Sequence, residues 1–408
     1  MTLKIYNSLT KKHEDFEPLK AGEVHMYSCG PTVYDRVHIG NLRAFLTSDL
    51  VRRTCEYLGF TVKQVMNITD IGIGGDNDEG EDKMIKGLKR EDMEITLDSI
   101  KALADKYTEQ FKEDILALNI KLPHTLPRAS EHLTEQVKMI QELEKKGFAY
   151  AADDAIYFDT SKDENYGKLG GLTPLNESQT RVEIGGKKNP RDFALWKFNS
   201  NLGYPSPWGQ GFPGWHIECS AMSQKYLGKS FDIHTGGIDL LPVHHNNEIA
   251  QSENACGCEF VRYWIHNEFV NFSGSNPEGE QAPNGARMAK STGNTINLSD
   301  LEEKGFSPLV YRYLLLQSHY RTPTTFSWES LEASSKALSK LQRLTSEIPE
   351  DGKVDQAYRA KFVEKLENDF NTPQALAVLW TLAKDKEVRP EDKRATILDF
   401  DRVLGLGL

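Results

Sequence analysis

The chain has 408 residues, which is enough to bury a large core in about two or three domains. Its hydrophobic share of 38% and charged share of 27% are ordinary for a water-soluble protein, and no run of about 18 apolar residues could span a bilayer. The formal net charge of −11 gives no support to general nucleic-acid binding, although it leaves room for a local basic surface. We therefore expect no membrane role.

The N-terminus and the cysteines indicate the compartment. The opening "MTLKIYNSLTKKHEDF" lacks the long apolar core of a signal peptide. The five cysteines, Cys29, Cys55, Cys219, Cys256 and Cys258, are too few and too scattered for a disulfide framework. We expect a cytoplasmic protein in which a functional cysteine would be a metal ligand or a nucleophile.

The first predicted elements are a strand, a helix and a strand. "EVHMYS" at 23–28 predicts a strand, the segment from about 40 to 57 has apolar residues at helical intervals, and "TVKQVMNI" at 61–68 predicts a second strand. This pattern indicates a parallel α/β unit of the dinucleotide-binding type, with a ligand site after the first strand. Backbone amides at the helix start could hold a phosphate, with His38 as a further donor and Gly40 allowing close approach. A histidine that only caps the helix is the alternative.

The remaining elements divide the chain further. "GIGGDNDEGEDK" at 72–83 predicts an exposed acidic loop whose spacing does not match a calcium site. Amphipathic helices are expected at 97–118 and 133–146, and the short strands and turns that follow indicate a small inserted domain at roughly 115–195. After Trp328 the chain is predicted to be mostly helical.

Two segments in the second half carry candidate metal ligands. "GWHIECSAMSQKYL" supplies Cys219, and "HHNNEIAQ" supplies His244 and Glu248. On a helix, residues four apart lie on one face, so this imidazole and this carboxylate can converge on one ion. With one or two thiolates the set would suit zinc, which accepts sulfur, nitrogen and oxygen ligands together. A core cysteine and a surface His–Glu pair are the alternative interpretation.

A third segment, "GARMAKSTGNTINLSDL" at 285–301, predicts a loop with a lysine in a glycine-rich setting. The ammonium of Lys290 could reach negative charge that develops on a transferring phosphate. An ordinary basic loop would have the same pattern.

The three segments in this order resemble a known family. "CGPTVYDRVHIGN" is similar to the first signature of class I aminoacyl-tRNA synthetases, His-Ile-Gly-His, and "RMAKS" is similar to the second, Lys-Met-Ser-Lys-Ser. Between them, "NITDI", "NPRDFALWK", "PGWHIECSAMS", "FDIHTGGIDL" and "HHNNEIAQ" resemble the cysteinyl-tRNA synthetases. The resemblance covers Leu3 to about Leu408.

The resemblance implies an α/β fold, with a Rossmann-like parallel-sheet catalytic domain, a small inserted α+β domain and a C-terminal helical domain. The implied domains are the first catalytic half, the inserted connective domain, the second catalytic half with the zinc site, the mobile signature loop with a stem-contact region, and a helical domain shorter than in the family. Their expected ranges are 1–114, 115–195, 196–285, 286–330 and 331–408.

The resemblance also implies the site residues. One Zn²⁺ per chain would be held by Cys29, Cys219, His244 and Glu248. The pocket for the substrate cysteine would be completed by Gly30, Thr69 and Trp215. The catalytic residues would be His38 and Lys290, and ATP would be bound by His38, Gly40, Asn41, Gly237, Asp239, Met288 and Lys290.

Some positions depart from the family pattern. Asn41 replaces the second histidine of the first signature, and in the second signature Arg287 and Ala289 replace a lysine and a serine. Because His38 and Lys290 are kept, we expect activity to survive, with slower activation at most. Cys256 and Cys258 match no family ligand, and their spacing is too tight for a usual zinc knuckle, so we expect incidental thiols.

The implied reaction joins L-cysteine to ATP, with Mg²⁺, and passes the activated cysteine to the 3′ end of tRNA-Cys. Zinc would bind the cysteine thiol far better than the hydroxyl of serine, so no editing domain is expected. The chain ends where the family usually has an anticodon-binding module, so tRNA selection would rest on the acceptor arm. We expect a monomer.

Two alternatives remain open. Related ligases share this catalytic core but join activated cysteine to the amine of a glucosamine-inositol, and they lack an anticodon module. The chain could also be a non-catalytic paralogue that binds only zinc or RNA. The retained His38, Lys290 and all four zinc ligands argue against the second alternative.

Overall fold

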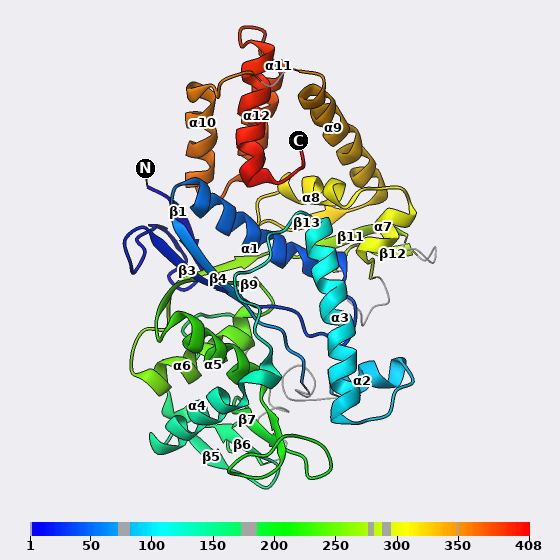
Figure 1. Ribbon diagram of the computed structural model, residues 1–408. Coiled ribbons are helices and arrows are strands. Elements are labelled where there is room, and N and C mark those ends of the chain that lie inside the picture. The colour runs from blue at the N-terminus through cyan, green and yellow to red at the C-terminus, as the bar shows by residue number, and fades with distance from the viewer. Residues whose placement is uncertain (1, 72–81, 173–185, 276–280, 288–294, 349–350) are drawn as a thin grey trace.

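A computed structural model of the protein describes residues 2–71, 82–172, 186–275, 281–287, 295–348 and 351–408 (Figure 1). The predicted α/β fold with a parallel sheet is confirmed. Within these ranges, no helix is both long enough and apolar enough to cross a membrane.

The central sheet contains the first predicted unit. In the described part of the chain it has four parallel strands in the order β10-β9-β3-β4, which are β3 (Glu23–Ser28), β4 (Thr61–Met66), β9 (Phe231–Gly237) and β10 (Val261–Asn267). Helix α1 (Ile39–Tyr57) connects β3 to β4, as predicted, and it covers the face of the sheet opposite to α5 (Trp215–Leu227) (Figure 1). Because β3 pairs with β9 in parallel, the carboxyl ends of these two strands lie side by side at the expected ligand edge.

Three helices follow β4 in the chain. They are α2 (Lys83–Arg90), α3 (Leu97–Ala117) and α4 (Leu133–Lys145), with a short 3₁₀ turn η2 (Ala129–His132) before the last. The predictions of helices at 97–118 and 133–146 are therefore confirmed to within one residue. The predicted acidic loop lies largely outside the described residues.

An antiparallel sheet lies between α4 and α5 in the sequence. Its strand order is β5-β6-β7-β8, and the strands are β5 (Ala149–Ala151), β6 (Ala155–Phe158), β7 (Phe193–Phe198) and β8 (Gly211–Pro213). A 3₁₀ turn, η3 (Thr160–Lys162), follows β6. Helix α4 buries Met139, Ile140 and Leu143 in the hydrophobic cluster that backs this sheet. Strand β8 lies beyond residue 195, where the predicted insert ends, and the predicted division into domains stays a prediction.

Smaller elements flank the central sheet. A hairpin of β1 (Lys4–Asn7) and β2 (Lys12–Asp15) opens the chain. After β10 comes a second small sheet of order β12-β11-β13, whose strands are β11 (Val270–Ser275), β12 (Gln281–Arg287) and β13 (Thr324–Phe326). Two helices, α7 (Leu298–Glu303) and α8 (Pro308–Leu316), lie between β12 and β13 in the sequence.

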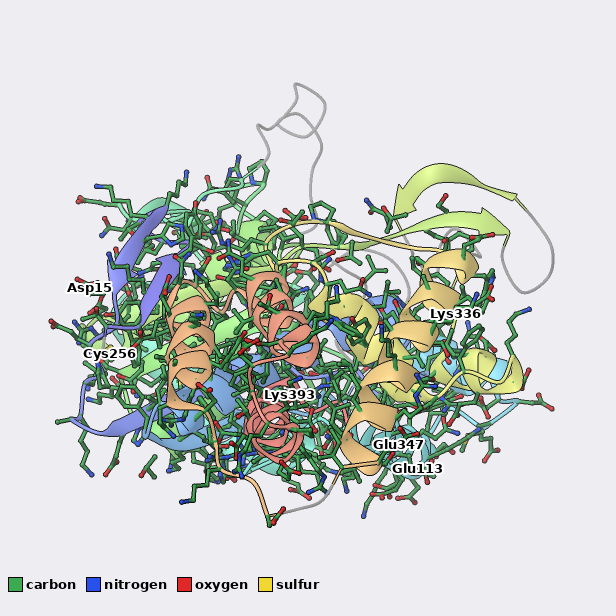
Figure 2. All side chains as sticks on the ribbon, turned by 90° about the horizontal axis from the view of Figure 1, so that it is seen from above. Asp15, Glu113, Cys256, Lys336, Glu347 and Lys393 are labelled. Carbon is green, nitrogen blue, oxygen red and sulfur yellow. A yellow bond between two sulfur atoms is a disulfide. The ribbon has the colours of Figure 1, made fainter. Side chains whose placement is uncertain are left out.

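The C-terminal part is helical, as predicted. It contains α9 (Trp328–Ser346), α10 (Gln356–Glu367), α11 (Thr372–Lys384) and α12 (Pro390–Leu404). In the view from above these helices lie in front of the rest of the chain (Figure 2). The rings of Phe362 and Phe400 stack with centroids 4.0 Å apart and join α10 to α12.

One buried arginine, Arg312, joins the C-terminal helices to α1, the helix that covers the central sheet. Arg312 on α8 has no exposed surface, and its guanidinium donates to Asp49 Oδ2 on α1 at 2.7 Å. The same group donates to the carbonyl oxygens of Leu118 at 3.0 Å and Leu404 at 2.6 Å. Because every contact is buried, α8, α1 and the end of α12 are held in one arrangement.

Two cysteines differ from expectation. Cys256 and Cys258, predicted to be separate thiols, form a disulfide, whereas Cys29, Cys55 and Cys219 are free. The prediction was wrong because sequence spacing does not show the backbone turn that brings the two sulfur atoms together.

Candidate active site

The loop after β3 begins the site. The amide of Cys29 donates to the carbonyl oxygen of Thr235 on β9 at 3.1 Å, and the amide of Gly30 donates to Asn67 Oδ1 at 2.8 Å. A Cβ at Gly30 would lie 1.7 Å from the carbonyl oxygen of Asn67, so no larger residue fits there. The sequence therefore turns sharply after β3, and Cys29 is fixed at the edge of the sheet.

The four predicted zinc ligands come together. One ligand atom from each of Cys29, Cys219, His244 and Glu248 lies within 4.8 Å of the other three. Cys219 lies in α5, His244 in the π-helical turn η4 (Leu241–His245), and Glu248 in the first turn of α6 (Asn246–Cys256). As the spacing of four residues predicts, His244 Nε2 lies 3.1 Å from Glu248 Oε1.

A second set of ligand atoms shares two of these residues. Cys29, His234, His245 and Glu248 also lie within 4.8 Å of one another. His234 Nε2 is 3.0 Å from Glu248 Oε2, and His245 Nε2 is 3.3 Å from Cys29 Sγ. Sequence reasoning missed both histidines as neighbours of the site, although "FDIHTGG" and the His-His pair carried them. Since Cys29 and Glu248 belong to both sets, the two sets describe one site.

The ionisation of the site favours a cation at its centre. Burial opposes the charged form of Glu248, yet His234 and His244 lower the pKa of its carboxyl to about 2. Burial likewise opposes a charged imidazole, but Glu248 and Cys219 raise the pKa of His244 to about 10. Against the effect of burial, hydrogen bonds from Cys29 and His244 lower the pKa of the Cys219 thiol to about 6. An anionic carboxylate and a thiolate therefore flank the positive charge of the His244 imidazolium. A metal ion would take the place of that charge and bind the neutral imidazole.

Three further histidines, His216, His245 and His266, stay neutral. Burial, followed by the neighbouring histidines, lowers the pKa of His216 and of His245 well below the usual range. Burial lowers the pKa of His266 to about 3. His216 Nδ1 lies 2.9 Å from His244 Nδ1, and His245 Nδ1 lies 2.7 Å from His266 Nε2. Through these hydrogen bonds the three rings can orient the site without adding charge.

The predicted pocket residues for the amino acid flank this set. The Thr69 side chain is almost fully buried, and the ring of Trp215 lies 4.3 Å from that of His244, centroid to centroid. Thr69 Oγ1 donates to Glu218 Oε2 at 2.8 Å and accepts from Asn67 Nδ2 at 3.1 Å. A buried chain of hydrogen bonds thus runs from Gly30 through Asn67 and Thr69 to Glu218.

Sequence reasoning missed Asn67 and Glu218. Glu218 has no exposed surface, and burial raises the pKa of its carboxyl well above the usual range. Within the described part of the chain its Oε1 atom has no hydrogen-bond partner. The signal was present, because Glu218 precedes Cys219 in "HIECS" and Asn67 lies two residues before Thr69 in "NITDI".

The predicted nucleotide residues lie at the same edge of the sheet or outside the described residues. His38 occupies the position before α1, but its side chain makes no capping hydrogen bond, so the capping alternative loses its support. The Ile39 amide donates to the carbonyl oxygen of Ile296 at 2.8 Å, which brings the segment after the second signature to the start of α1. Gly237 ends β9. Asp239 follows, while Met288 and Lys290 are not among the described residues.

Known proteins match this chain over nearly its whole length. The model of the family described as "tRNA synthetases class I (C) catalytic domain" matches residues 15–336, and that of the "DALR domain" matches residues 361–406. A cysteine–tRNA ligase 1 from Burkholderia lata is 45% identical over 100% of this chain and 85% of its own length. A cysteine–tRNA ligase from Treponema denticola is 40% identical, over 100% of this chain and 87% of the relative. The chain belongs to the cysteine–tRNA ligase family.

Solved structures of class I synthetases share the fold. Methionyl-tRNA synthetase from Mycobacterium tuberculosis, bound by methionyl-adenylate, superposes with a TM-score of 0.61 at 14% identity, covering 94% of this chain and 90% of the other. A leucyl-tRNA synthetase from Agrobacterium radiobacter, in a ternary complex with tRNA, superposes with a TM-score of 0.64 at 11% identity, covering 96% of this chain and 84% of the other. At these identities the likeness concerns the fold alone.

The comparison corrects one prediction for this member of the cysteine–tRNA ligase family. The expected lack of an anticodon-binding module is not borne out, because the DALR domain matches residues 361–406, which include α11 and α12. The sequence pattern indicated helices there but did not identify the module to which they belong.

Proposed function

We propose that the protein activates L-cysteine with Mg-ATP and transfers the cysteinyl group to the 3′ end of tRNA-Cys. The observation that carries this proposal is the buried set of Cys29, Cys219, His244 and Glu248 beside Thr69. The set lies where the carboxyl ends of β3 and β9 meet the start of α1, the usual ligand position in a parallel α/β sheet. The names of the relatives support the choice of amino acid and of tRNA.

The donor set fits zinc. Two sulfur atoms, an imidazole nitrogen and a carboxylate oxygen form a combination that zinc accepts and that magnesium or calcium would not select. A zinc ion held by Cys29, Cys219, His244 and Glu248 would supply a Lewis acid that prefers an ionised thiol to the much less acidic hydroxyl of serine.

The residues around this set orient the amino acid. Thr69 and Trp215 flank the ligand atoms, and the missing side chain at Gly30 lets its backbone pack closely against the carbonyl group of Asn67. Asn67 and Glu218 fix the hydroxyl of Thr69 from both sides. We infer that this fixed pocket holds the cysteine with its carboxylate directed toward the nucleotide, so that the reaction gains from orientation.

The nucleotide is assigned to the start of α1. The positive end of the α1 dipole, with His38, Gly40 and Asn41, is suited to attract phosphate oxygens. Gly237 ends β9, the strand next to β3, and Asp239 follows it; we assign both residues to the ribose. Met288 and Lys290 of the second signature complete the proposed ATP site, with Lys290 neutralising charge on the transferring phosphate.

The acceptor arm of the tRNA is the part that must enter this site, because the acyl group is transferred to its terminal ribose. We propose that a monomer carries out both steps. The helical region that matches the DALR domain is available for contacts with other parts of the tRNA.

Cysteine-dependent exchange of labelled pyrophosphate into ATP tests the activation step. Zinc-loaded protein should support exchange with L-cysteine and far less with L-serine, by a factor on the order of 10⁴. Exchange that does not depend on cysteine would overturn the proposal. Activation followed by transfer to a glucosamine-inositol amine, and not to tRNA, would favour the alternative ligase, and absence of any exchange would favour the non-catalytic paralogue.

A further inference from the structure

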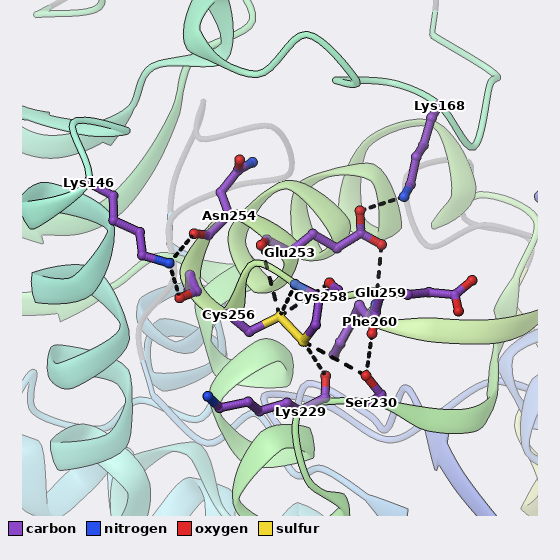
Figure 3. Close-up of a disulfide and its surroundings, with 11 residues drawn as sticks. Lys146, Lys168, Lys229, Ser230, Glu253, Asn254, Cys256, Cys258, Glu259 and Phe260 are labelled. Atoms are coloured by element: carbon purple, nitrogen blue, oxygen red, sulfur yellow. Dashed lines mark hydrogen bonds and ion pairs between the residues drawn. A yellow bond between two sulfur atoms is a disulfide. The ribbon is translucent and has the colours of Figure 1, made fainter. Parts of the chain in front are cut away.

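The disulfide between Cys256 and Cys258 has no part in the proposed reaction. Cys256 is the last residue of α6, and Cys258 lies in the connection to β10 (Figure 3). Among the other cysteines, Cys29 and Cys219 belong to the metal-binding set, and Cys55 is fully buried. The pair therefore needs a separate explanation.

A glycine makes the pairing possible. Gly257 has φ 73° and ψ 29°, a left-handed conformation that closes the helix and that most other residues adopt at a cost. Its amide donates to the carbonyl oxygen of Glu253 at 2.7 Å. A Cβ at this position would meet open space, so packing does not select glycine here. The backbone turn itself selects it, and the turn brings the two cysteines together.

A disulfide this short contributes little to the stability of the fold. Cross-links stabilise mainly by closing a loop in the unfolded chain, and here the loop contains one intervening residue. Other contacts already hold the end of α6. Lys146 Nζ donates to the carbonyl oxygens of Asn254 at 3.0 Å and Ala255 at 2.7 Å, and the Phe260 amide donates to Glu253 Oε1 at 3.2 Å (Figure 3).

Small molecules can reach the pair. Cys256 and Cys258 are both partly exposed and Gly257 is exposed, and the view from above places Cys256 at the rim of the molecule (Figure 2). Around the sulfur atoms lie small groups: the Glu253 carbonyl oxygen is 3.9 Å from Cys256 Sγ, and Ser230 Oγ is 3.8 Å from Cys258 Sγ.

We propose that Cys256 and Cys258 form a reversible thiol–disulfide site that exchanges two electrons with low-molecular-weight thiols and disulfides of the glutathione type. In oxidation, one protein thiolate attacks the external disulfide, whose S–S bond breaks and releases one thiol. The second protein thiolate then attacks the mixed disulfide, forms the internal S–S bond and releases a second thiol. The two protein protons end on the released thiols, and the external disulfide gains the two electrons that the protein loses.

The test equilibrates the full-length protein in buffers of reduced and oxidised glutathione at different ratios. After acid quenching and alkylation, mass spectrometry of the peptide that contains residues 256–258 counts the alkylated cysteines. We expect this peptide to pass from two alkyl groups to none in one two-electron transition that is the same in both directions. Two alkyl groups at the most oxidising ratio, a stop at a glutathione mixed disulfide, or a bond that dithiothreitol does not reduce would each overturn the proposal.

Two controls separate this site from other thiols. Cys258→Ser should leave Cys256 unable to close the internal bond, so that it accumulates as a glutathione mixed disulfide. Cys55 should stay unmodified in the folded protein because it is fully buried. The readout does not depend on aminoacylation, so its failure and the failure of the proposed function are distinguishable.

Discussion

The hydroxyl of Thr69 lies between two buried partners, accepting from Asn67 and donating to Glu218. In Glu218→Leu the hydroxyl loses its acceptor and can turn away from the pocket. We expect the KM for cysteine in pyrophosphate exchange to rise about three- to tenfold, the usual effect of one hydrogen bond, while the KM for ATP stays unchanged. Glu218→Gln keeps an acceptor oxygen and should restore most of the affinity.

The double variant separates positioning from a general structural effect. If Glu218 acts through Thr69, then Thr69→Val and Glu218→Leu together should raise the KM for cysteine no more than the larger single effect. Additive effects, or an equal rise in the KM for ATP, would show that Glu218 merely supports the fold.

The metal-binding set gives a second prediction at this scale. Replacing Cys219 by serine removes one of two sulfur ligands, and we expect bound zinc to fall from about one per chain to a small fraction after gel filtration. Elemental analysis by mass spectrometry measures the content. Cys55→Ser is the matched control, because Cys55 is equally buried but lies outside the set. Equal zinc in both variants would argue against Cys219 as a ligand.

Single residues were predictable to different degrees. The four zinc ligands came from the resemblance, and spacing alone supported only the pairing of His244 with Glu248. The role of Glu218 was missed because its carboxylate meets Thr69, which lies 149 residues away in the chain. His234 lies 14 residues from its partner Glu248, but on a different element, β9, so no helical or strand spacing pairs the two. Lys290, the predicted catalytic cation, lies outside the described residues and stays a prediction.

At the scale of elements, Arg312 is the contact on which the packing of α8, α1 and α12 depends. Arg312→Met would leave Asp49 with one charged partner fewer in a buried setting, and we expect the free energy of unfolding to fall by about 3–5 kcal/mol. Urea unfolding measures the change.

Arg389, the residue directly before α12, is the matched control. It pairs with Asp392 at 2.9 Å but is largely exposed, so Arg389→Met should change the unfolding free energy little. A similar loss in both variants would contradict the central role of the buried pair.

The elements with a clear repeat were predicted well. The strand at 23–28 and the helix after it were found within a residue or two, because a hydrophobic period fixes both the type and the length of an element. The three-residue strands β5, β8 and β13 are too short to show a period. The parallel pairing of β3 with β9 joins residues about 200 positions apart, which no local pattern reveals.

At the scale of the whole molecule, the chain combines a synthetase catalytic region with a helical region that matches the DALR domain. The sequence showed that the tail was helical but not which module it formed, because amphipathic helices have the same pattern in many folds. We therefore predict an enzyme that uses both regions on one substrate, tRNA-Cys.

Transfer of radiolabelled L-cysteine to a tRNA-Cys transcript, by zinc-loaded protein with Mg-ATP, tests this account most directly. We predict that acid-precipitable label accumulates on the transcript, that it is released by mild base as expected for an ester, and that labelled serine gives no signal. Cysteine-dependent pyrophosphate exchange without any label on the transcript would contradict the account.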